Sequence, residues 1–210
     1  MKITLPDNSS RELPEGSSGY DLAKDIGPGL AKSAVAVSVD GVQRDLHDVI
    51  EGDASVSIIT IDSDEGIEIM RHTLTAQVLA RAIKNLYPKS KLAIGPTIDD
   101  GFYYDVESEK SISSDDLSKI EDEMKKIIKT KSSITKKLVS KSEALKVFKE
   151  NKESYKEIIV NESKQKDNFQ LYYQDDKKFV DLCRGPHLPN LEFIGSFKLT
   201  KVSGAYWKGD

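Results

Sequence analysis

The stretch "GIEIMRHTLTAQVLARAIKNLYP", residues 66–88, decides the fold of the larger part of this chain. Its apolar residues recur every three or four positions, a spacing that places them on one face of an α-helix. This stripe consists of Ile67, Met70, Leu74, Val78, Ala82 and Leu86. The helix is predicted to end before Pro88, because proline cannot continue it. A single histidine, His72, lies in the first half of the stretch.

The residues before this helix predict a small sheet with one or two short helices. Residues 1–6 and 11–16 favour a hairpin, and Ser18 caps a short helix that stops at Gly27. An Asp-Gly turn joins two further strands, and residues 55–62 add another. This β-β-α-β-β order is typical of a β-grasp module. The polar stretch "DSDEG" (62–66) then predicts a linker between two domains, at residues 1–62 and 64–210.

Strands, turns and helices alternate after the long helix. Residues 91–107 predict short strands around two turns, whereas residues 169–176, 178–183 and 197–207 are strand-like. Two capping boxes predict helices, formed by Ser113 with Asp116 and by Ser140 with Glu143. The lysine run at 125–137 is interpreted as a solvated helix face and its exit, which could also contact a phosphate backbone. The predicted fold class is α+β, with the β-grasp domain followed by a larger domain whose helices pack on an antiparallel sheet.

Composition limits the classes of function. With 38% apolar and 31% charged residues, the 210-residue chain is predicted to be soluble and globular. A net charge of −4 argues against a broad phosphate-binding surface, although not against a local basic patch. One cysteine excludes an internal disulfide, and the lack of a signal-peptide pattern predicts the cytosol. The longest apolar runs are a few residues long, so no membrane span is expected.

A few residues could carry chemistry. The chain has three histidines, His47, His72 and His187, of which His47 is expected to be a surface residue. In "DLCRGPHLP" (181–189), Cys183 and His187 flank a Gly-Pro pair that shapes the loop between them. Three interpretations stay open from spacing alone. They are a structural thiol beside a loop histidine, a zinc site that adds His72, and a nucleophilic cysteine with His187 as its base.

Five stretches together resemble the N-terminal region of bacterial threonyl-tRNA synthetases. They are "IMRHTLTAQVLARAIKNLYP", "AIGPTIDDGFYYDVE", "ESYK", "FVDLCRGPHLPN" and "FKLTKVSGAYWKGD". The resemblance covers essentially the whole chain. It implies a TGS domain at residues 1–62 and an editing domain at 64–210. No stretch resembles an ATP- or threonine-binding motif, so the class II catalytic core is expected to be absent.

The resemblance also implies a reaction. Serine is threonine without one methyl group, and a binding pocket discriminates such a difference by only about 1–3 kcal/mol. A second site is therefore expected to hydrolyse the ester of seryl-tRNA(Thr) to serine and tRNA(Thr). The implied partners are the 3′ acceptor end of tRNA(Thr) and the remainder of a synthetase chain, with its class II core and anticodon-binding domain. The site is expected to work in the cytoplasm without a cofactor or a metal.

The family's functional positions carry over residue by residue. The catalytic set is His72, Lys156, Cys183 and His187, and the substrate contacts are Thr73, Gln77 and Asp181. Lys156 is expected to hold or activate the water, or to stabilise negative charge. Asp181 suits the α-amino group of the substrate. Cys183 and His187 are expected to shape the pocket and to contact water or the terminal ribose.

One stretch departs from the family pattern, which is Arg-His-Ser-x-Ala-His. Here one residue is inserted, and Gln77 replaces the second histidine. On a regular helix, His72 and Gln77 would lie about 140° apart. Either the helix begins after His72, or a π-bulge absorbs the insertion and restores the facing pair.

Glutamine can orient a water but cannot exchange a proton near neutral pH. An alternative function is therefore a degenerate editing domain that binds the tRNA acceptor arm without efficient hydrolysis. A free-standing alanyl-type hydrolase with zinc is a third interpretation, which the TGS module and "GAYWKGD" (204–210) oppose.

Overall fold

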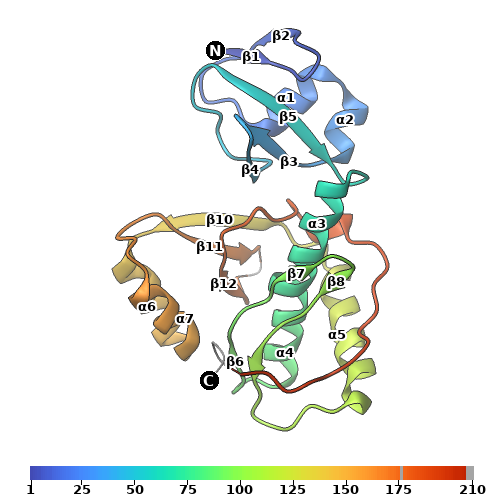
Figure 1. Ribbon diagram of the computed structural model, residues 1–210, viewed down its shortest axis with the longest axis vertical. Helices are drawn as coiled ribbons and strands as arrows, with labels where there is room; N and C mark the ends of the chain where they lie inside the picture. The colour runs from blue at the N-terminus through green and yellow to red at the C-terminus, as the bar shows by residue number, and fades with distance from the viewer. Residues whose placement is uncertain (176, 207–210) are drawn as a thin grey trace. The chain divides into compact units, whose positions relative to one another are not determined.

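The computed structural model describes residues 1–175 and 177–206, and the chain divides into two compact units (Figure 1). The first unit comprises Met1–Met70 with Gly185–Phe193, and the second comprises Arg71–Arg184 with Ile194–Asp210. The first unit thus runs beyond the predicted linker at 62–66. The reason is local, because this polar stretch forms the start of a helix. The side-chain oxygen of Ser63 accepts the backbone N–H of Gly66 at 3.0 Å, as a helix cap does.

The first unit is built on a five-stranded sheet in the order β2-β1-β5-β3-β4. Its strands are β1 (Lys2–Thr4), β2 (Ser10–Glu12), β3 (Ala34–Val39), β4 (Val42–Asp45) and β5 (Ala54–Thr60). Strands β1 and β5 run parallel, and the other pairs are antiparallel. Asp40 and Gly41 both adopt positive φ in the β3-β4 turn, as an Asp-Gly hairpin turn requires. The strands predicted for this region are confirmed.

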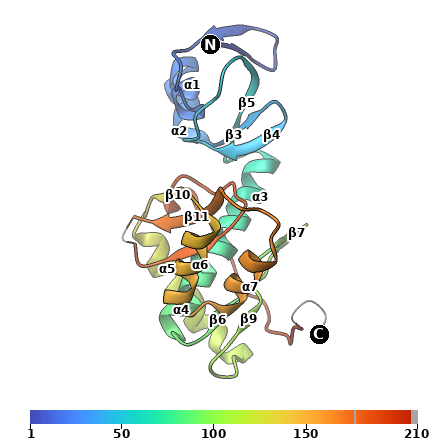
Figure 2. The same ribbon diagram turned by 90° about the vertical axis from the view of Figure 1, so that its left-hand side faces the viewer.

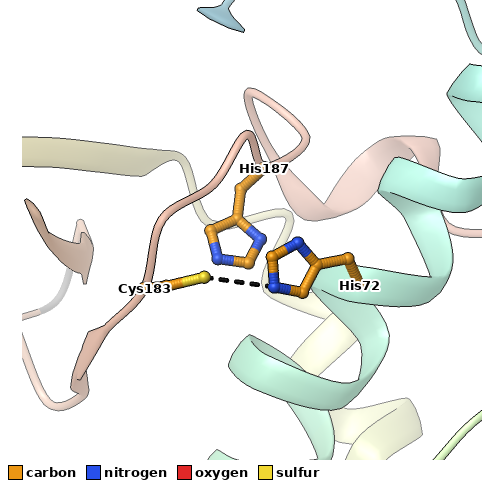
Figure 3. Close-up of side chains that lie close together, drawn as sticks. All are labelled: His72, Cys183 and His187. Carbon is orange, nitrogen blue, oxygen red and sulfur yellow. Dashed lines mark hydrogen bonds between the residues drawn. The ribbon is translucent and has the colours of Figure 1, made fainter. Parts of the chain in front are cut away.

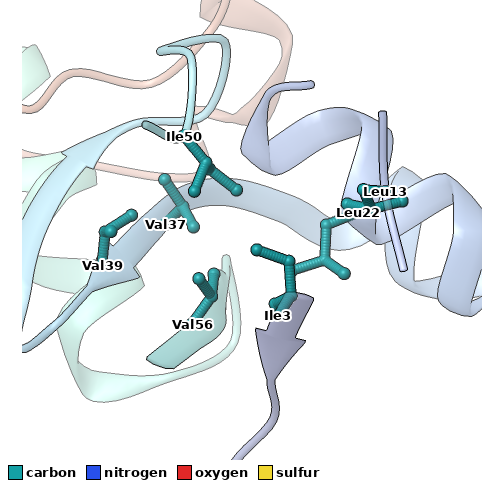
Figure 4. Packing of buried hydrophobic residues seen from close by; sticks show 7 residues of the cluster. All are labelled: Ile3, Leu13, Leu22, Val37, Val39, Ile50 and Val56. Carbon is teal, nitrogen blue, oxygen red and sulfur yellow. The ribbon is translucent and has the colours of Figure 1, made fainter. Parts of the chain in front are cut away.

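Two helices accompany this sheet. Helix α1 (Gly19–Ile26) begins with the capping box of Ser18 and Asp21, and α2 (Pro28–Ser33) is the second of the one or two short helices predicted here. The Gly-Pro-Gly stretch was expected to end the helical region, but proline is also favoured at the first position of a helix. A buried apolar cluster fills the space between α1 and the sheet (Figure 4). Its members are Ile3, Leu13, Leu22, Val37, Val39, Ile50 and Val56. A short 3₁₀ turn, η3 (Leu191–Phe193), also belongs to the first unit.

The long helix predicted at residues 67–86 consists of three consecutive parts. They are α3 (Asp64–Thr73), the π-helical turn η1 (Leu74–Leu79) and α4 (Ala80–Leu86). A π-helix closes its hydrogen bonds from i to i+5 and so holds one more residue per turn than an α-helix. The predicted π-bulge is confirmed at the inserted residue. The alternative start after His72 is wrong, because α3 already contains this histidine.

Short strand pairs and a second long helix follow. Strand β6 (Lys91–Leu92) pairs with β9 (Val106–Glu107), and β7 (Thr97–Ile98) pairs with β8 (Gly101–Phe102). The 3₁₀ turn η2 (Ser114–Asp116) leads into α5 (Leu117–Lys129), and the predicted capping box of Ser113 and Asp116 is present. Helix α5 packs against α4 and η1. No helix in the described part of the chain is long and apolar enough to cross a membrane.

A three-stranded antiparallel sheet completes the second unit. It contains β10 (Ile134–Val139), β11 (Phe169–Gln174) and β12 (Val180–Leu182), in that order. Helices α6 (Lys141–Glu150) and α7 (Ser154–Glu162) pack together beside it (Figure 2). The shared core consists of Val139, Ala144, Phe148, Val160, Phe169 and Leu171. Helices packed on an antiparallel sheet confirm the predicted α+β class.

The second unit also corrects two expectations. The last four residues of the lysine run, 134–137, belong to strand β10, although the run was interpreted as a helix face and its exit. Residues 197–206, predicted to be strand-like, form no strand. The backbone N–H of Leu199 instead donates to the Glu121 carboxylate on α5 at 2.7 Å. Residues 207–210 of the same predicted strand and motif lie outside the described residues.

Candidate functional site

A buried ion pair lies at the end of the three-stranded sheet. Asp181 comes from β12 and Lys156 from α7, and Nζ of the lysine lies 2.8 Å from Oδ1 of the aspartate. Only 4% of the lysine side chain and 3% of the aspartate side chain are exposed. Removing either charge from water is costly unless the partner compensates for it. Two of the residues predicted for the site are therefore brought together, and each permits the burial of the other.

The start of α7 is held in place by a second acidic residue. Glu153 accepts the backbone N–H of Leu92 at 2.8 Å and lies 2.6 Å from the ammonium of Lys84. These contacts join the first turn of α7 to β6 and α4. The turn that carries Lys156 is thus fixed by elements distant in sequence.

Tyr104, which is half-buried, contacts both members of this ion pair, and the sequence analysis did not single it out. Its hydroxyl donates to Oδ2 of Asp181 at 3.2 Å, and its ring centroid lies 5.8 Å from Nζ of Lys156. A Cβ atom added to Gly95 would collide with the Tyr104 ring, so glycine is needed there. The feature of the sequence that could have indicated this residue is the pair of adjacent tyrosines, Tyr103 and Tyr104. Tyr103 is exposed, whereas Tyr104 is half-buried.

Burial dominates the electrostatics of this group. Burial raises the pKa of Asp181, while the positive charge of Lys156 and the hydrogen bonds to the carboxylate oppose the rise. Burial also raises the pKa of Tyr104 well above its ordinary value, and the nearby charge of Asp181 adds to the effect. Tyr104 therefore stays protonated at neutral pH and can act as a hydrogen-bond donor.

A cysteine-histidine pair lies two residues further along the chain (Figure 3). Sγ of Cys183 is 3.1 Å from Nε2 of His72, and the backbone N–H of Cys183 donates to Gln170 O at 3.2 Å. His72 is the residue before the last of α3, so the π-helix begins immediately after this turn. The thiol donates to the ring, or the ring N–H donates to sulfur, according to the imidazole tautomer. The structure thus joins these two predicted site residues.

The third member of the predicted motif belongs to the first unit. His187 follows Cys183 by four residues on the same loop, is buried, and donates its backbone N–H to Asp45 at 2.9 Å. Imidazole nitrogens and thiol sulfur, which these motifs contain, are ligand types that zinc prefers. The absence of a metal stays a prediction.

The sequence also made predictions for Thr73 and His47. Thr73, expected to contact the substrate, is buried as the last residue of α3. His47 is exposed, as predicted, and its ring lies 5.2 Å from that of Tyr20.

The residue that replaces the second histidine is fully buried. The carbonyl oxygen and Oε1 of Gln77 accept hydrogen bonds from Nε2 of Gln174, at 3.0 and 3.3 Å. Oε1 of Gln174 in turn accepts from Nη1 of Arg81 at 2.5 Å. Nε2 of Gln77 is buried without a hydrogen-bond partner among the described residues. The hydrogen bonds of Gln77 therefore join the π-helix to the central strand β11 rather than to the cysteine-histidine pair.

Comparison with known proteins finds a family match in each of the two end regions of the chain. Residues 1–60 match the TGS domain, and residues 170–208 match the threonyl and alanyl tRNA synthetase second additional domain. A threonine--tRNA ligase of Paracidovorax citrulli (strain AAC00-1) is 47% identical over 210 residues, which is 100% of this chain and 32% of the relative. That of Hahella chejuensis (strain KCTC 2396) is 47% identical over 208 residues, which is 99% of this chain and 32% of the relative. The chain thus spans about a third of the length of these relatives.

Proposed function

We propose that this chain, which combines a TGS domain with the second additional domain of threonyl- and alanyl-tRNA synthetases, hydrolyses the ester of seryl-tRNA(Thr). It is similar along its whole length to the N-terminal region of bacterial threonine--tRNA ligases. One observation carries the proposal. Asp181 and Cys183, two residues apart at the end of β12, hold Lys156 and His72 respectively. The products are serine and tRNA(Thr).

The groups present suit ester hydrolysis by water. This reaction needs an oriented water, stabilisation of the oxyanion, and a proton for the leaving ribose oxygen. The carboxylate of Asp181 binds the α-amino group of the amino acid, and the ammonium of Lys156 stabilises the oxyanion. The protonated hydroxyl of Tyr104 keeps this carboxylate oriented through its own hydrogen bond. Their mutual contacts in the free protein keep these groups in position before the substrate arrives.

The cysteine-histidine pair serves the other side of the ester. Cys183 and His72 hold the water or the terminal ribose, and His187, on the loop that follows, takes part in the same task. Thr73 and Gln77 complete the proposed substrate contacts. The proposed partner is the remainder of a synthetase, with its class II core and anticodon-binding domain. That part attaches the amino acid to tRNA in the cytoplasm, and the reaction proposed here removes serine attached in error.

A second candidate function is binding of the tRNA acceptor arm without efficient hydrolysis. The observation that favours it is the burial of Gln77, whose hydrogen bonds go to Gln174. A glutamine at this position cannot move a proton, so a mechanism that needs two proton carriers would fail.

Deacylation of seryl-tRNA(Thr), with threonyl-tRNA(Thr) as the control substrate, tests the proposal. We expect the chain to release serine faster than threonine, and we expect Lys156→Ala to abolish the difference. The matched control is Lys164→Ala, which removes an exposed lysine and should leave the rate unchanged. Tight binding of the acceptor arm without any release of serine would support the second candidate and overturn the first.

A further inference from the structure

The face of the three-stranded sheet that carries the site extends outward to β10. In the register of the sheet, Lys136 on β10 lies opposite Tyr172 on β11, which lies opposite Asp181 on β12. Directly opposed residues of antiparallel strands project from the same face. Lys136 therefore belongs to the same face as the aspartate of the site.

A second row runs parallel to the first. Leu138 lies opposite Gln170, whose carbonyl oxygen accepts the N–H of Cys183. Cys183 projects from the same face as Asp181, because residues two apart along a strand share a face. Leu138 is 53% exposed, so its side chain is accessible on this face. Two interstrand spacings, about 10 Å, separate it from the cysteine.

The opposite face of the sheet is already covered. Val139, Leu171 and Phe169 project from it into the core shared with α6 and α7. On β10 itself both faces are partly exposed, and Leu138 is an exposed apolar residue on the face that leads to the site.

Positive charge is concentrated around this strand. Between Lys125 and Lys152 the chain has ten lysines and two glutamates, although the whole chain carries a net charge of −4. Residues 1–61 contain five basic and ten acidic residues, so the first unit offers no comparable surface. Exposed lysines of this segment include Lys125, Lys126, Lys129, Lys137, Lys146, Lys149 and Lys152. Such a local excess attracts a polyanion.

We propose that Lys136 and Leu138 of β10 dock the single-stranded 3′ end of the aminoacylated tRNA. The proposal rests on the proposed function and assigns its docking surface. Proteins bind single-stranded RNA by combining cations that follow the phosphates with exposed apolar or aromatic side chains that pack on unpaired bases. The lysine contacts a phosphate, and the leucine packs on the nucleotide before the terminal one. The esterified terminal ribose then reaches Cys183 and Asp181 along the same face.

The test uses the double variant Lys136→Gln/Leu138→Ser and two substrates. Seryl-tRNA(Thr) carries the phosphates and the preceding nucleotide, whereas 3′-O-seryl-adenosine lacks both. We expect KM for seryl-tRNA(Thr) to rise about tenfold, which corresponds to about 1.4 kcal/mol. We expect kcat/KM for seryl-adenosine to stay unchanged. The salt dependence of KM should also weaken, by about 0.7 in slope for each phosphate of the single strand that β10 no longer neutralises.

The matched control is Lys32→Gln/Val42→Ser, which removes an exposed lysine and an exposed valine from the first unit. This control should leave KM for seryl-tRNA(Thr) and kcat/KM for seryl-adenosine unchanged. An equal loss on both substrates in the β10 variant would show that β10 only supports the site, and would overturn the docking proposal. An unchanged KM for seryl-tRNA(Thr) would overturn it as well.

A separate binding measurement keeps this inference distinct from the proposed function. If the unaltered chain hydrolyses neither substrate, the proposed function fails, and docking is then measured by fluorescence anisotropy with an RNA hairpin. Hairpins with and without the 3′ single strand are compared. Docking predicts that the strand tightens binding and that the β10 variant loses this gain. An affinity that does not depend on the strand would refute docking.

Discussion

Replacing Gln174 by leucine should release the π-helix that brings His72 to Cys183. The side chain of Gln174 donates to Gln77 and accepts from Arg81, and all three residues are buried. Leucine is similar in size but has no hydrogen-bonding atoms. The substitution therefore leaves polar groups of the two partners without this hydrogen bond in the interior.

The expected loss of stability follows from the hydrogen bonds that Gln174 makes with Gln77 and Arg81. A buried neutral group that loses its hydrogen bond costs about 1–3 kcal/mol, and a bond to a charged group contributes about 1.5–3 kcal/mol. We therefore expect the free energy of unfolding of the second unit to fall by about 2.5–6 kcal/mol, a large part of the 5–15 kcal/mol typical of a domain. The comparison variant is Gln170→Leu on the same strand and face. That side chain accepts one bond, from Tyr172 at 3.3 Å, and is half-buried, so about 0.5–1.5 kcal/mol is expected.

Two assays separate loss of stability from loss of positioning. Urea unfolding monitored by hydrogen exchange within residues 74–79 gives the local free energy. The pH profile of Cys183 alkylation in the folded protein reports on the contact with His72, because the thiolate is the reactive form. We expect Gln174→Leu to change this profile and Gln170→Leu to leave it as it is. If both variants lose the same stability and keep the same profile, the buried amide pair does not hold the π-helix.

Three other changes have defined outcomes. Gly95→Ala should push the Tyr104 ring away from Asp181, lower kcat for seryl-tRNA(Thr) and lower the free energy of unfolding by about 1–3 kcal/mol; an unchanged kcat would argue against a role for this tyrosine. Glu121→Gln should lower stability at neutral pH, because the hydrogen bond from the backbone N–H of Leu199 lowers the pKa of Glu121. A lowered pKa stabilises the fold above the ordinary value of 4.5, so the difference from the parent should shrink as the pH falls below it, and a constant difference would contradict this. Deleting Thr75 together with Gln77→His should convert the π-helix to an α-helix and raise seryl-tRNA(Thr) hydrolysis; no gain over the parent would show that the histidine is not needed.

Local signals allowed much of the fold to be predicted. The capping boxes at Ser18, Ser113 and Ser140 are all present, because each depends on residues three positions apart. The π-helix was also predictable, because one inserted residue in a helix must be absorbed within a turn or shift every side chain beyond it. Strand β10 was not predictable with the same certainty. Its sequence "ITKKLV" shows no alternation, since one face is covered by helices and the other is the site face.

The candidate site was only partly visible in the sequence because its contacts are long-range. Tyr104 lies 77 residues from Asp181, and the aromatic pair that contains it gave no indication of the partner. Gln77 was expected to contact the substrate because it occupies the position of the second motif histidine. In the π-helical turn the side chain instead bonds to Gln174, 97 residues away. A partner at that distance is fixed by sheet packing and not by helical geometry.

The insertion and the glutamine are best understood as one coupled change. An added residue in the helix requires a π-turn, and a π-turn needs support, because its geometry is rarely stable without tertiary contacts. The carbonyl oxygen and the side-chain oxygen of Gln77 both accept from Nε2 of Gln174, whereas a neutral imidazole at this position would offer one acceptor nitrogen in place of the amide oxygen. The amide pair with Gln174 provides this support from a fully buried strand. We therefore expect Gln77, which lacks proton-transfer chemistry, to have a positioning role, and the Cys183 alkylation profile of Gln174→Leu tests whether the contact between His72 and Cys183 depends on it.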